Sequence, residues 1–228
     1  MNTSTVGTAA RFSWSFTALK NFETCPRRYQ AYTLTKEVVE PESEALRQGH
    51  ALHAAFEARV AKGTPLPLGM GMHERLLAKL AAAPGQVHAE QKLALTHDFR
   101  PASWFSHGAW FRTVVDYANI RDGGLATVID YKTGKPDYAD DVQLALTAAT
   151  VMAHEPGVKH VKAALLFVAY GQVERHEYRR EDLSAIWAGV LPRVRKLWNA
   201  RQEDVFPPKP GGLCRRYCAV SSCPFNGR

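Results

Sequence analysis

Residues 114–132 read VVDYANIRDGGLATVIDYK, and this stretch decides the fold. Two apolar runs flank Arg121-Asp122-Gly123-Gly124, which is typical of a β-hairpin. If Gly123 is the centre of a three-residue turn, directly opposed residues have numbers that sum to 246, as Asp116 and Asp130 do. The Cβ atoms of this pair would then be roughly 5 Å apart. A slip of one residue would place the two carboxylates on different faces of the sheet.

The second run ends in Asp130-Tyr131-Lys132, whose first and third side chains leave the same face of a strand. Two opposed carboxylates repel unless a cation lies between them. Mg²⁺ and Mn²⁺ bind carboxylate and carbonyl oxygens, so Asp116, Asp130 and the Tyr131 carbonyl are candidate ligands. Lys132 could hold or help deprotonate the attacking water in phosphodiester hydrolysis. Taken alone, the tripeptide is also typical of solvent-exposed residues near the end of a strand.

The regions on either side of this hairpin predict one α/β domain over residues 1–228 with a mixed central sheet flanked by helices. Residues 12–85 are predicted to be helical, and residues 86–178 to form the sheet core. Residues 179–228 form a helix and a cysteine tail. The predicted helices are Ser15–Tyr32 (kinked at Pro26), Glu42–Lys62 (with Leu46, Leu52, Ala55, Phe56 and Val60 as its apolar side), His73–Ala83, Tyr138–His154 and Arg180–Arg201. The predicted strands are Val87–Thr96, Gly108–Ile120, Leu125–Lys132, Val161–Tyr170 and Val173–Tyr178.

The charge of the chain favours a polyanionic partner. The 228 residues carry a net charge of +7, with a pI near 9.3, and clustered Lys and Arg gain free energy by releasing counterions from phosphates. The sequence has no run of about 18 apolar residues and no secretory signal at its start. We therefore expect no membrane contact and a reducing cytoplasm, in which four cysteines serve a metal or remain thiols.

Several residues in order resemble the PD-(D/E)XK nuclease superfamily. The similarity is to its RecB-type branch, which includes the nuclease domains of bacterial helicase–nucleases and the CRISPR-adaptation nucleases, and it extends from Ser15 to Cys223. The resemblance implies a restriction-endonuclease-like core, with Asp116 as first acid and Asp130-x-Lys132 as signature. The other residues that it implies are His53 as metal ligand in Gly49-x3-His53, Glu90 as a further acid at the start of the first strand, and Gln143 on the following helix.

Some features leave alternatives open. A lone helical histidine is more often a surface or core residue, so only the resemblance assigns a metal to His53. Glu90 also fits an exposed strand charge. Thr147 occupies a position where the family commonly has tyrosine. Thr133-Gly134-Lys135 resembles the end of a phosphate-binding loop, but Asp130 replaces the required upstream glycine, which excludes nucleotide binding.

The four cysteines are Cys25, near the start, and Cys214-x3-Cys218-x4-Cys223 at the end. One distant and three neighbouring thiols supply the ligand set of a [4Fe–4S] cluster. Several RecB-type nucleases are similar, although their last three cysteines are usually spaced x2 and x5. The resemblance therefore implies a cluster that joins the N- and C-terminal segments. Structural Zn²⁺ and four unliganded thiols are the alternatives.

We expect a divalent-metal-dependent deoxyribonuclease, in particular an exonuclease, that acts in recombination, repair or phage DNA processing. The weaker candidates for phosphate contacts are Arg27, Arg28, Lys135, Arg215 and Arg216. Two other hypotheses are a catalytically silent DNA-binding or recombination scaffold and a zinc-stabilised interaction protein. The sequence identifies no helicase or recombination partner.

Overall fold

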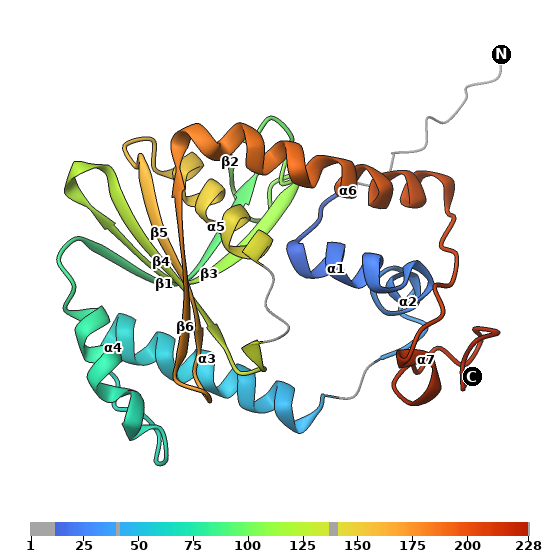
Figure 1. Cartoon of the computed structure of the whole chain (residues 1–228), viewed down its shortest axis with the longest axis horizontal. Helices are drawn as coiled ribbons and strands as arrows, with labels where there is room; N and C mark the ends of the chain where they lie inside the picture. The colour runs from blue at the N-terminus through green and yellow to red at the C-terminus, as the bar shows by residue number, and fades with distance from the viewer. Residues whose placement is uncertain (1–11, 40–41, 137–140, 228) are drawn as a thin grey trace.

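A mixed sheet forms the centre of the computed structural model, which describes residues 12–39, 42–136 and 141–227. The six strands of this described part have the order β2-β1-β3-β4-β5-β6. β4 and β5 are parallel, and all other neighbours are antiparallel. The strands are β1 (Gln86–Leu95), β2 (Pro101–Ala102), β3 (Phe111–Arg121), β4 (Leu125–Lys132), β5 (His160–Phe167) and β6 (Gln172–Arg179). The predicted α/β fold with a mixed sheet is confirmed (Figure 1).

The β3–β4 hairpin has the predicted register. Tyr117 is paired with Ile129 and Arg121 with Leu125, so the residue numbers of each pair sum to 246. Asp122–Gly124 form the three-residue turn, and Gly123 has a φ of 78°. Glycine adopts this left-handed conformation without the steric cost that a Cβ would add.

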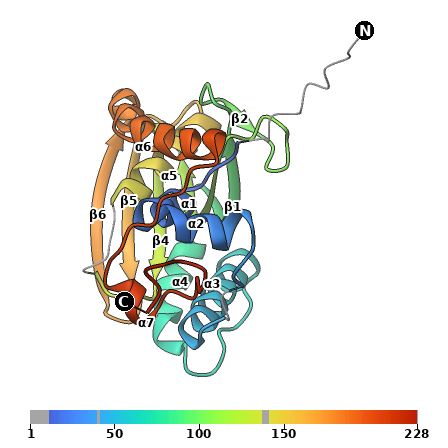
Figure 2. The ribbon, with the colours of Figure 1, turned by 90° about the vertical axis from the view of Figure 1, so that its right-hand side faces the viewer.

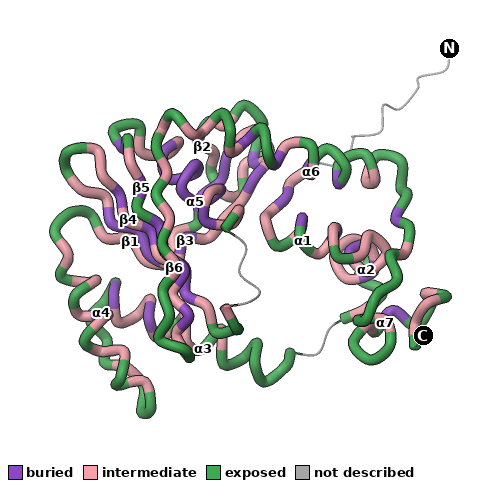
Figure 3. Tube along the Cα trace, viewed as in Figure 1, coloured by how far each residue is buried: buried purple, intermediate pink, exposed green. Residues whose placement is uncertain are grey.

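One face of the sheet packs against α5 (Asp141–His154), which α6 (Leu183–Glu203) covers from outside (Figure 2). α5 is apolar almost all round because it lies between the sheet and α6. The core of this layer consists of Leu93, Val115, Ala118, Ala126, Val128, Leu144, Ala148, Val151, Met152, Val158, Val161, Ala163, Leu165 and Phe167. Buried residues accordingly gather on the central strands and on α5 (Figure 3).

The other face packs against α3 (Glu44–Lys62) and α4 (Glu74–Ala81), and a 3₁₀ turn, Gly71–His73, precedes α4. Ser43 caps α3 through the backbone N–H of Leu46, and Gly63 ends it in a left-handed conformation with a φ of 69°. The smaller core here consists of Phe56, Val60, Leu77, Tyr117 and Tyr131. α3 thereby brings one helix face against β1, β3 and β4.

The N-terminal helices lie beside α6. Ser15 caps α1 (Phe16–Thr24), and Pro26 begins the separate helix α2 (Pro26–Tyr29), which continues as a π-helical turn, Gln30–Leu34. The carboxylate of Glu23 on α1 forms an ion pair of 2.6 Å with Arg193 on α6.

The C-terminal tail, with the short helix α7 (Leu213–Arg216), packs on α1 and α2 (Figure 2). The ammonium of Lys209 donates to the carbonyl of Glu23 at 2.7 Å, and the amide of Ala219 donates to the hydroxyl of Tyr32 at 3.2 Å. The first described helices and the C-terminal tail are therefore held together by ordinary hydrogen bonds.

Three details differ from the sequence prediction. β2 was not predicted, because a two-residue strand has no periodicity. Leu46, expected on the apolar side of α3, is 49% exposed because it faces a cleft rather than the sheet. The predicted first residues of α5, from Tyr138 to Asp140, lie outside the described residues. Within the described ranges, no helix is long and apolar enough to cross a membrane.

Candidate active site

A cleft of about 970 Å³ separates the sheet from the helices α1 and α3. β3 and β4 form its floor, the first turn of α1 lies on one wall, and the first half of α3 forms another. All the residues predicted for catalysis except Glu90 line this cleft: His53, Asp116, Asp130, Lys132 and Gln143. The fold therefore brings residues from three separate segments to one site.

Three acids lie in one row across neighbouring strands. In the β1–β3 pair, Ala89 is opposite Tyr117 and Gln91 is opposite Val115, so the position between them places Glu90 opposite Asp116. The register of the hairpin places Asp130 next in the row, one step beyond the last ladder pair. Glu90 thus lies in the middle of β1. This differs from the sequence prediction, which placed it at the start of the strand.

The backbone is irregular in this row. Glu90 has a φ of 48°, a left-handed conformation that is rare for a residue with a side chain. Ala89 packs with the core beside α3 and α4, whereas Leu93 packs with the core beside α5, although a regular strand would turn both to the same face. β3 shows the same change of face: Val115 packs with the core beside α5, and Tyr117 packs with the core beside α3 and α4. Such strain is characteristic of functional sites.

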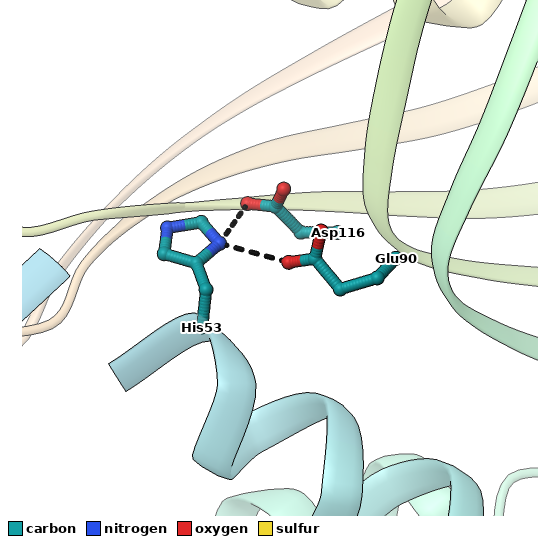
Figure 4. Close-up of side chains that lie close together, drawn as sticks. All are labelled: His53, Glu90 and Asp116. Atoms are coloured by element: carbon teal, nitrogen blue, oxygen red, sulfur yellow. Dashed lines mark hydrogen bonds and ion pairs between the residues drawn. The ribbon is translucent and has the colours of Figure 1, made fainter. Parts of the chain in front are cut away.

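His53, on α3, lies next to Glu90 and Asp116, and these three side chains form the first half of the site. Nδ1 of His53 lies 3.0 Å from Oε1 of Glu90 and 3.5 Å from Oδ2 of Asp116 (Figure 4). Hydrogen bonds to Asp116 and Glu90 raise the pKa of His53 to about 10, despite the opposing effect of burial. Within the described residues this is the one group of three such side chains with ligand atoms all within 4.8 Å of one another.

Asp130, Lys132 and Gln143 form the second half of the site. The ammonium of Lys132 lies 2.7 Å from Oδ2 of Asp130 and donates to Oε1 of Gln143 at 2.8 Å. The amide nitrogen of Gln143 donates to Oδ1 of Asp130 at 2.8 Å. Burial and the charge of Asp116 raise the pKa of Asp130 to about 6, against the lowering effect of Lys132.

The two halves meet at Tyr131. Its backbone N–H donates to Oδ2 of Asp116 at 2.7 Å, and its ring packs against Phe56 and His53. The carboxylate of Asp116 therefore contacts His53, whereas the carboxylate of Asp130 is held by Lys132 and Gln143. The register prediction is confirmed, but Asp130 lies outside the compact group of three that contains Asp116.

The first half fits a hard divalent cation. The two carboxylate oxygens suit Mg²⁺ or Mn²⁺, whereas the imidazole nitrogen is a ligand that softer ions such as Zn²⁺ and Fe²⁺ also favour. Two donors bonded to one ion at about 2.1 Å are at most about 4.2 Å apart, and the three groups already lie within 4.8 Å. A small side-chain movement would bring His53, Glu90 and Asp116 to bonding distance.

The helix α5 presents Gln143 to the site without the tyrosine that is common in the family. Thr147 occupies that position, is buried, and donates its hydroxyl to the carbonyl of Gln143 at 2.9 Å. It therefore takes part in helix packing and does not reach the cleft.

The cysteines come together less closely than the prediction of a Cys₄ cluster requires. Cys25, Cys214, Cys218 and Cys223 line one cavity, but its volume is only about 10 Å³, and all four are free thiols. In the described part of the chain, no three of their sulfur atoms lie within 4.8 Å of one another. The predicted cluster is therefore not confirmed.

The predicted phosphate-binding arginines differ in their surroundings. Arg27 is held by an ion pair of 2.6 Å with Glu37 and a hydrogen bond to Ser222. Arg28 lies 4.5 Å from the centre of the Tyr32 ring. The remaining predicted cations are exposed: Lys135, Arg215 and Arg216.

Trp104 and Arg112 also line the cleft, and the sequence analysis missed both. Arg112 precedes Asp116 by four residues on the same strand, a spacing that places both on one face of a regular strand. That alternation was an available signal for Arg112. Trp104 lies in a loop between β2 and β3, for which periodicity gives no information.

Comparisons with known proteins give the family and the fold of the chain. The sequence matches the model of the PD-(D/E)XK nuclease superfamily over residues 13–224. A search of curated proteins found no match. A solved structure from Eubacterium rectale, provisionally named as an exonuclease, has 15% identity and a TM-score of 0.51 and covers 94% of this chain and 91% of its own.

A second solved structure, SSO0001, has 17% identity and a TM-score of 0.46, with 96% of this chain and 89% of that chain covered. The Eubacterium rectale structure shares the fold with this chain. The family model spans nearly the whole sequence, including every residue of the two halves of the site. The chain therefore belongs to the PD-(D/E)XK nuclease superfamily.

Proposed function

We propose that this protein is a Mg²⁺- or Mn²⁺-dependent deoxyribonuclease of the RecB-type branch, and that it acts as an exonuclease in recombination, repair or phage DNA processing. The observation that carries the proposal is the cation-binding group His53, Glu90 and Asp116 beside the Asp130–Lys132–Gln143 group. All of these residues except Glu90 line one cleft. A binding-only module has no need for this second group.

His53, Glu90 and Asp116 would hold the metal, and Asp130 with the Tyr131 carbonyl are proposed as further ligands. The bound cation supplies Lewis-acid stabilisation of negative charge on the phosphoryl oxygens. Asp116 is held in place by the Tyr131 N–H, so its carboxylate is oriented before any ligand binds. This preorganisation reduces the rearrangement needed during the reaction.

Lys132 would position the attacking water and stabilise the charge that develops on its oxygen. Asp130 and Gln143 hold two of the three ammonium donors of Lys132, which leaves one for the water. Gln143 donates to Asp130 and accepts from Lys132, so its amide fixes both partners in one orientation. The arrangement suits hydrolysis of a phosphodiester bond.

The exonuclease assignment is supported by the provisional name of the Eubacterium rectale structure, whose fold this chain shares. It would be tested with end-labelled linear and closed circular single-stranded DNA, in Mg²⁺ or Mn²⁺. An exonuclease degrades the linear strand and leaves the circle intact. Cleavage of the circle at the same rate would make the protein an endonuclease.

We also propose that Cys25, Cys214, Cys218 and Cys223 bind a [4Fe–4S] cluster. All four line one cavity between the chain ends, but the tail would have to move outward, because the cavity is too small for four irons and four sulfides. A single Zn²⁺ would instead need its thiolates closer together, since Zn–S bonds are about 2.3 Å. Anaerobic purification followed by iron, sulfide and zinc analysis would decide. Stoichiometric zinc without iron would contradict the cluster.

The catalytic proposal is tested with Asp130→Asn and Lys132→Ala, with the exposed Lys79 on α4 changed to alanine as the matched control. Labelled single- and double-stranded DNA would be incubated with each protein in Mg²⁺, Mn²⁺ or EDTA. We expect metal-dependent cleavage by the wild type and by Lys79→Ala, and none by the two site variants. Cleavage that persists in both site variants would refute the mechanism.

A further inference from the structure

We propose that Trp104 and Arg112 form a nucleotide-binding subsite that holds an unpaired nucleotide of the DNA strand, away from the bond that is cut. The inference rests on the proposed nuclease function, because the strand must also reach the row of acids. Trp104 and Arg112 line the same cleft as Asp116 and Asp130 but, within the described residues, form no hydrogen bond or ion pair with either of them.

The two side chains are held together. Nε of Arg112 donates to the backbone carbonyl of Trp104 at 2.9 Å, and its guanidinium carbon lies 5.8 Å from the centre of the indole ring. This distance is within the range of a cation–π contact. The loop before β3 and the strand itself therefore fix the guanidinium at one place in the cleft.

Arg112 has unused capacity to bind an anion. Within the described ranges it forms no ion pair, and only its Nε has a hydrogen-bonding partner among the side-chain nitrogens. The only carboxylates that line the described cleft are Asp116 and Asp130, farther along β3 and β4. A guanidinium with free terminal N–H groups binds phosphate through two parallel hydrogen bonds.

The surroundings of Arg112 add positive potential. Its backbone N–H donates to the carbonyl of Trp14 at 3.0 Å, which places the start of α1 beside it. Phe16 and Thr17 in the first turn of α1 also line the cleft. The backbone N–H groups at a helix start carry partial positive charge. This end of the cleft is thus suited to phosphate, and the acidic end to a cation.

The spacing along β3 places the subsite at a definite distance from the scissile phosphate. Arg112 and Asp116 are four residues apart, which is about 14 Å at about 3.4 Å per residue. A nucleic-acid strand advances about 3.4 Å per nucleotide in a helix and farther when it is extended. Arg112 would therefore contact a phosphate about two to four nucleotides from the cleavage point.

Trp104 makes the subsite selective for an unpaired strand. An indole ring and a guanidinium are flat surfaces on which bases stack, and stacking needs a base whose face is open. In a duplex, neighbouring base pairs cover those faces. The pair would consequently hold single-stranded DNA, or a frayed end, more tightly than a blunt duplex.

The test measures binding separately from cleavage. Wild type, Trp104→Ala, Trp104→Phe, Arg112→Ala and Arg112→Lys would be titrated into fluorescein-labelled oligothymidylate and a blunt duplex, with EDTA present. The matched controls are Arg75→Ala on α4 and Trp198→Ala on α6, both outside the cleft. Thermal melting would verify that each variant is folded.

We expect Trp104→Ala and Arg112→Ala each to weaken single-strand binding about tenfold. Arg112→Ala should also reduce the slope of log K against log salt by about one. Trp104→Phe should retain most of the affinity because it keeps a stacking ring. Duplex binding should change less than twofold. Unchanged single-strand affinity in folded Trp104→Ala and Arg112→Ala would overturn the proposal, as would an equal loss for the duplex.

A fluorescent base analogue locates the subsite. A single 2-aminopurine would be moved along the oligonucleotide, and its fluorescence should be quenched at one position in the wild type but not in Trp104→Ala. Quenching without cleavage in Mg²⁺ or Mn²⁺ would mean that the subsite is correct and the nuclease function wrong. Cleavage without position-specific quenching would mean the reverse.

Discussion

The acidic cleft and the cysteine cavity each gather residues that are far apart in sequence, but they are built differently. At the edge of the cleft, the strands and α3 fix His53, Glu90 and Asp116 close enough to accept a cation after a small movement. The C-terminal tail is mostly exposed (Figure 3). The cysteines line one small cavity beside it, and no three of their sulfurs in the described residues lie within 4.8 Å of one another.

The difference follows from the scaffold under each group. Most strand residues are fixed by ladder bonds to their neighbours, so the register sets the approximate spacing of side chains in a row. The tail has one four-residue helix and is held to α1 and the π-helical turn by individual hydrogen bonds rather than by a continuous ladder. Such segments open locally at a lower free energy than strands do. A metal would therefore bind at the cleft to ligands that are already close together. Near the cysteines, its binding would first have to bring the four sulfur atoms together.

The largest expected effect concerns the site in the cleft. Lys132→Ala should reduce cleavage by about 10³-fold, because the charge that develops on the attacking oxygen loses its nearest cation. Initial rates on labelled single-stranded DNA would measure it, with circular dichroism to verify the fold. A loss below tenfold would mean that Lys132 acts only as the ion-pair partner of Asp130.

The next effect concerns the cysteine region. If a cluster closes the loop from Cys25 to Cys214, Cys214→Ser should lower the free energy of unfolding by about 3 kcal/mol, as a cross-link across a long loop does. Anaerobic urea denaturation would measure it, with Ser221→Ala in the same tail as the control. Equal stability of Cys214→Ser and wild type would leave the thiols without a structural ligand.

Metal binding to the cleft should stabilise the fold by a similar amount. Mn²⁺ at a hundred times its dissociation constant adds about 2.7 kcal/mol, because it binds the folded state alone. Thermal melting with and without Mn²⁺ would measure this gain, which His53→Ala should abolish. The same gain in His53→Ala would exclude His53 as a ligand. His50→Ala, one turn earlier on α3, should retain it.

The smallest effect concerns the bridge between the two catalytic partners. Gln143→Ala should slow cleavage about tenfold, or about 1.4 kcal/mol, because Lys132 and Asp130 lose their shared orienting amide. Single-turnover rates would measure it, with Gln48→Ala on α3 as the control. A loss as large as that of Lys132→Ala would make Gln143 a direct participant rather than a positioning residue.

The sequence predicted the hairpin because its information is local. Gly123 determines the turn, and the turn determines which residues of β3 and β4 are opposed. Local signals likewise placed a helix start at Ser15, whose side chain caps α1, and a helix end at Lys62, where α3 ends.

What the sequence could not supply depends on three-dimensional context. The left-handed conformation of Glu90 has no marker in its neighbours, because glutamate is not a residue that favours it. β1 and β3 change the face to which their side chains point at this row. Asp116 therefore contacts His53, and Asp130 contacts Gln143. The arrangement of the cysteines depends on how the tail packs, which spacing alone does not determine.

The conformation of Glu90 has a consequence for protein engineering. A glutamate at a φ of 48° costs the folded state about 1 kcal/mol, which glycine or asparagine would recover. A library selected only for thermal stability should therefore be enriched in Glu90→Gly and Glu90→Asn. Both changes remove a carboxylate from the proposed metal site. At this position, selection for stability and selection for metal binding favour opposite outcomes.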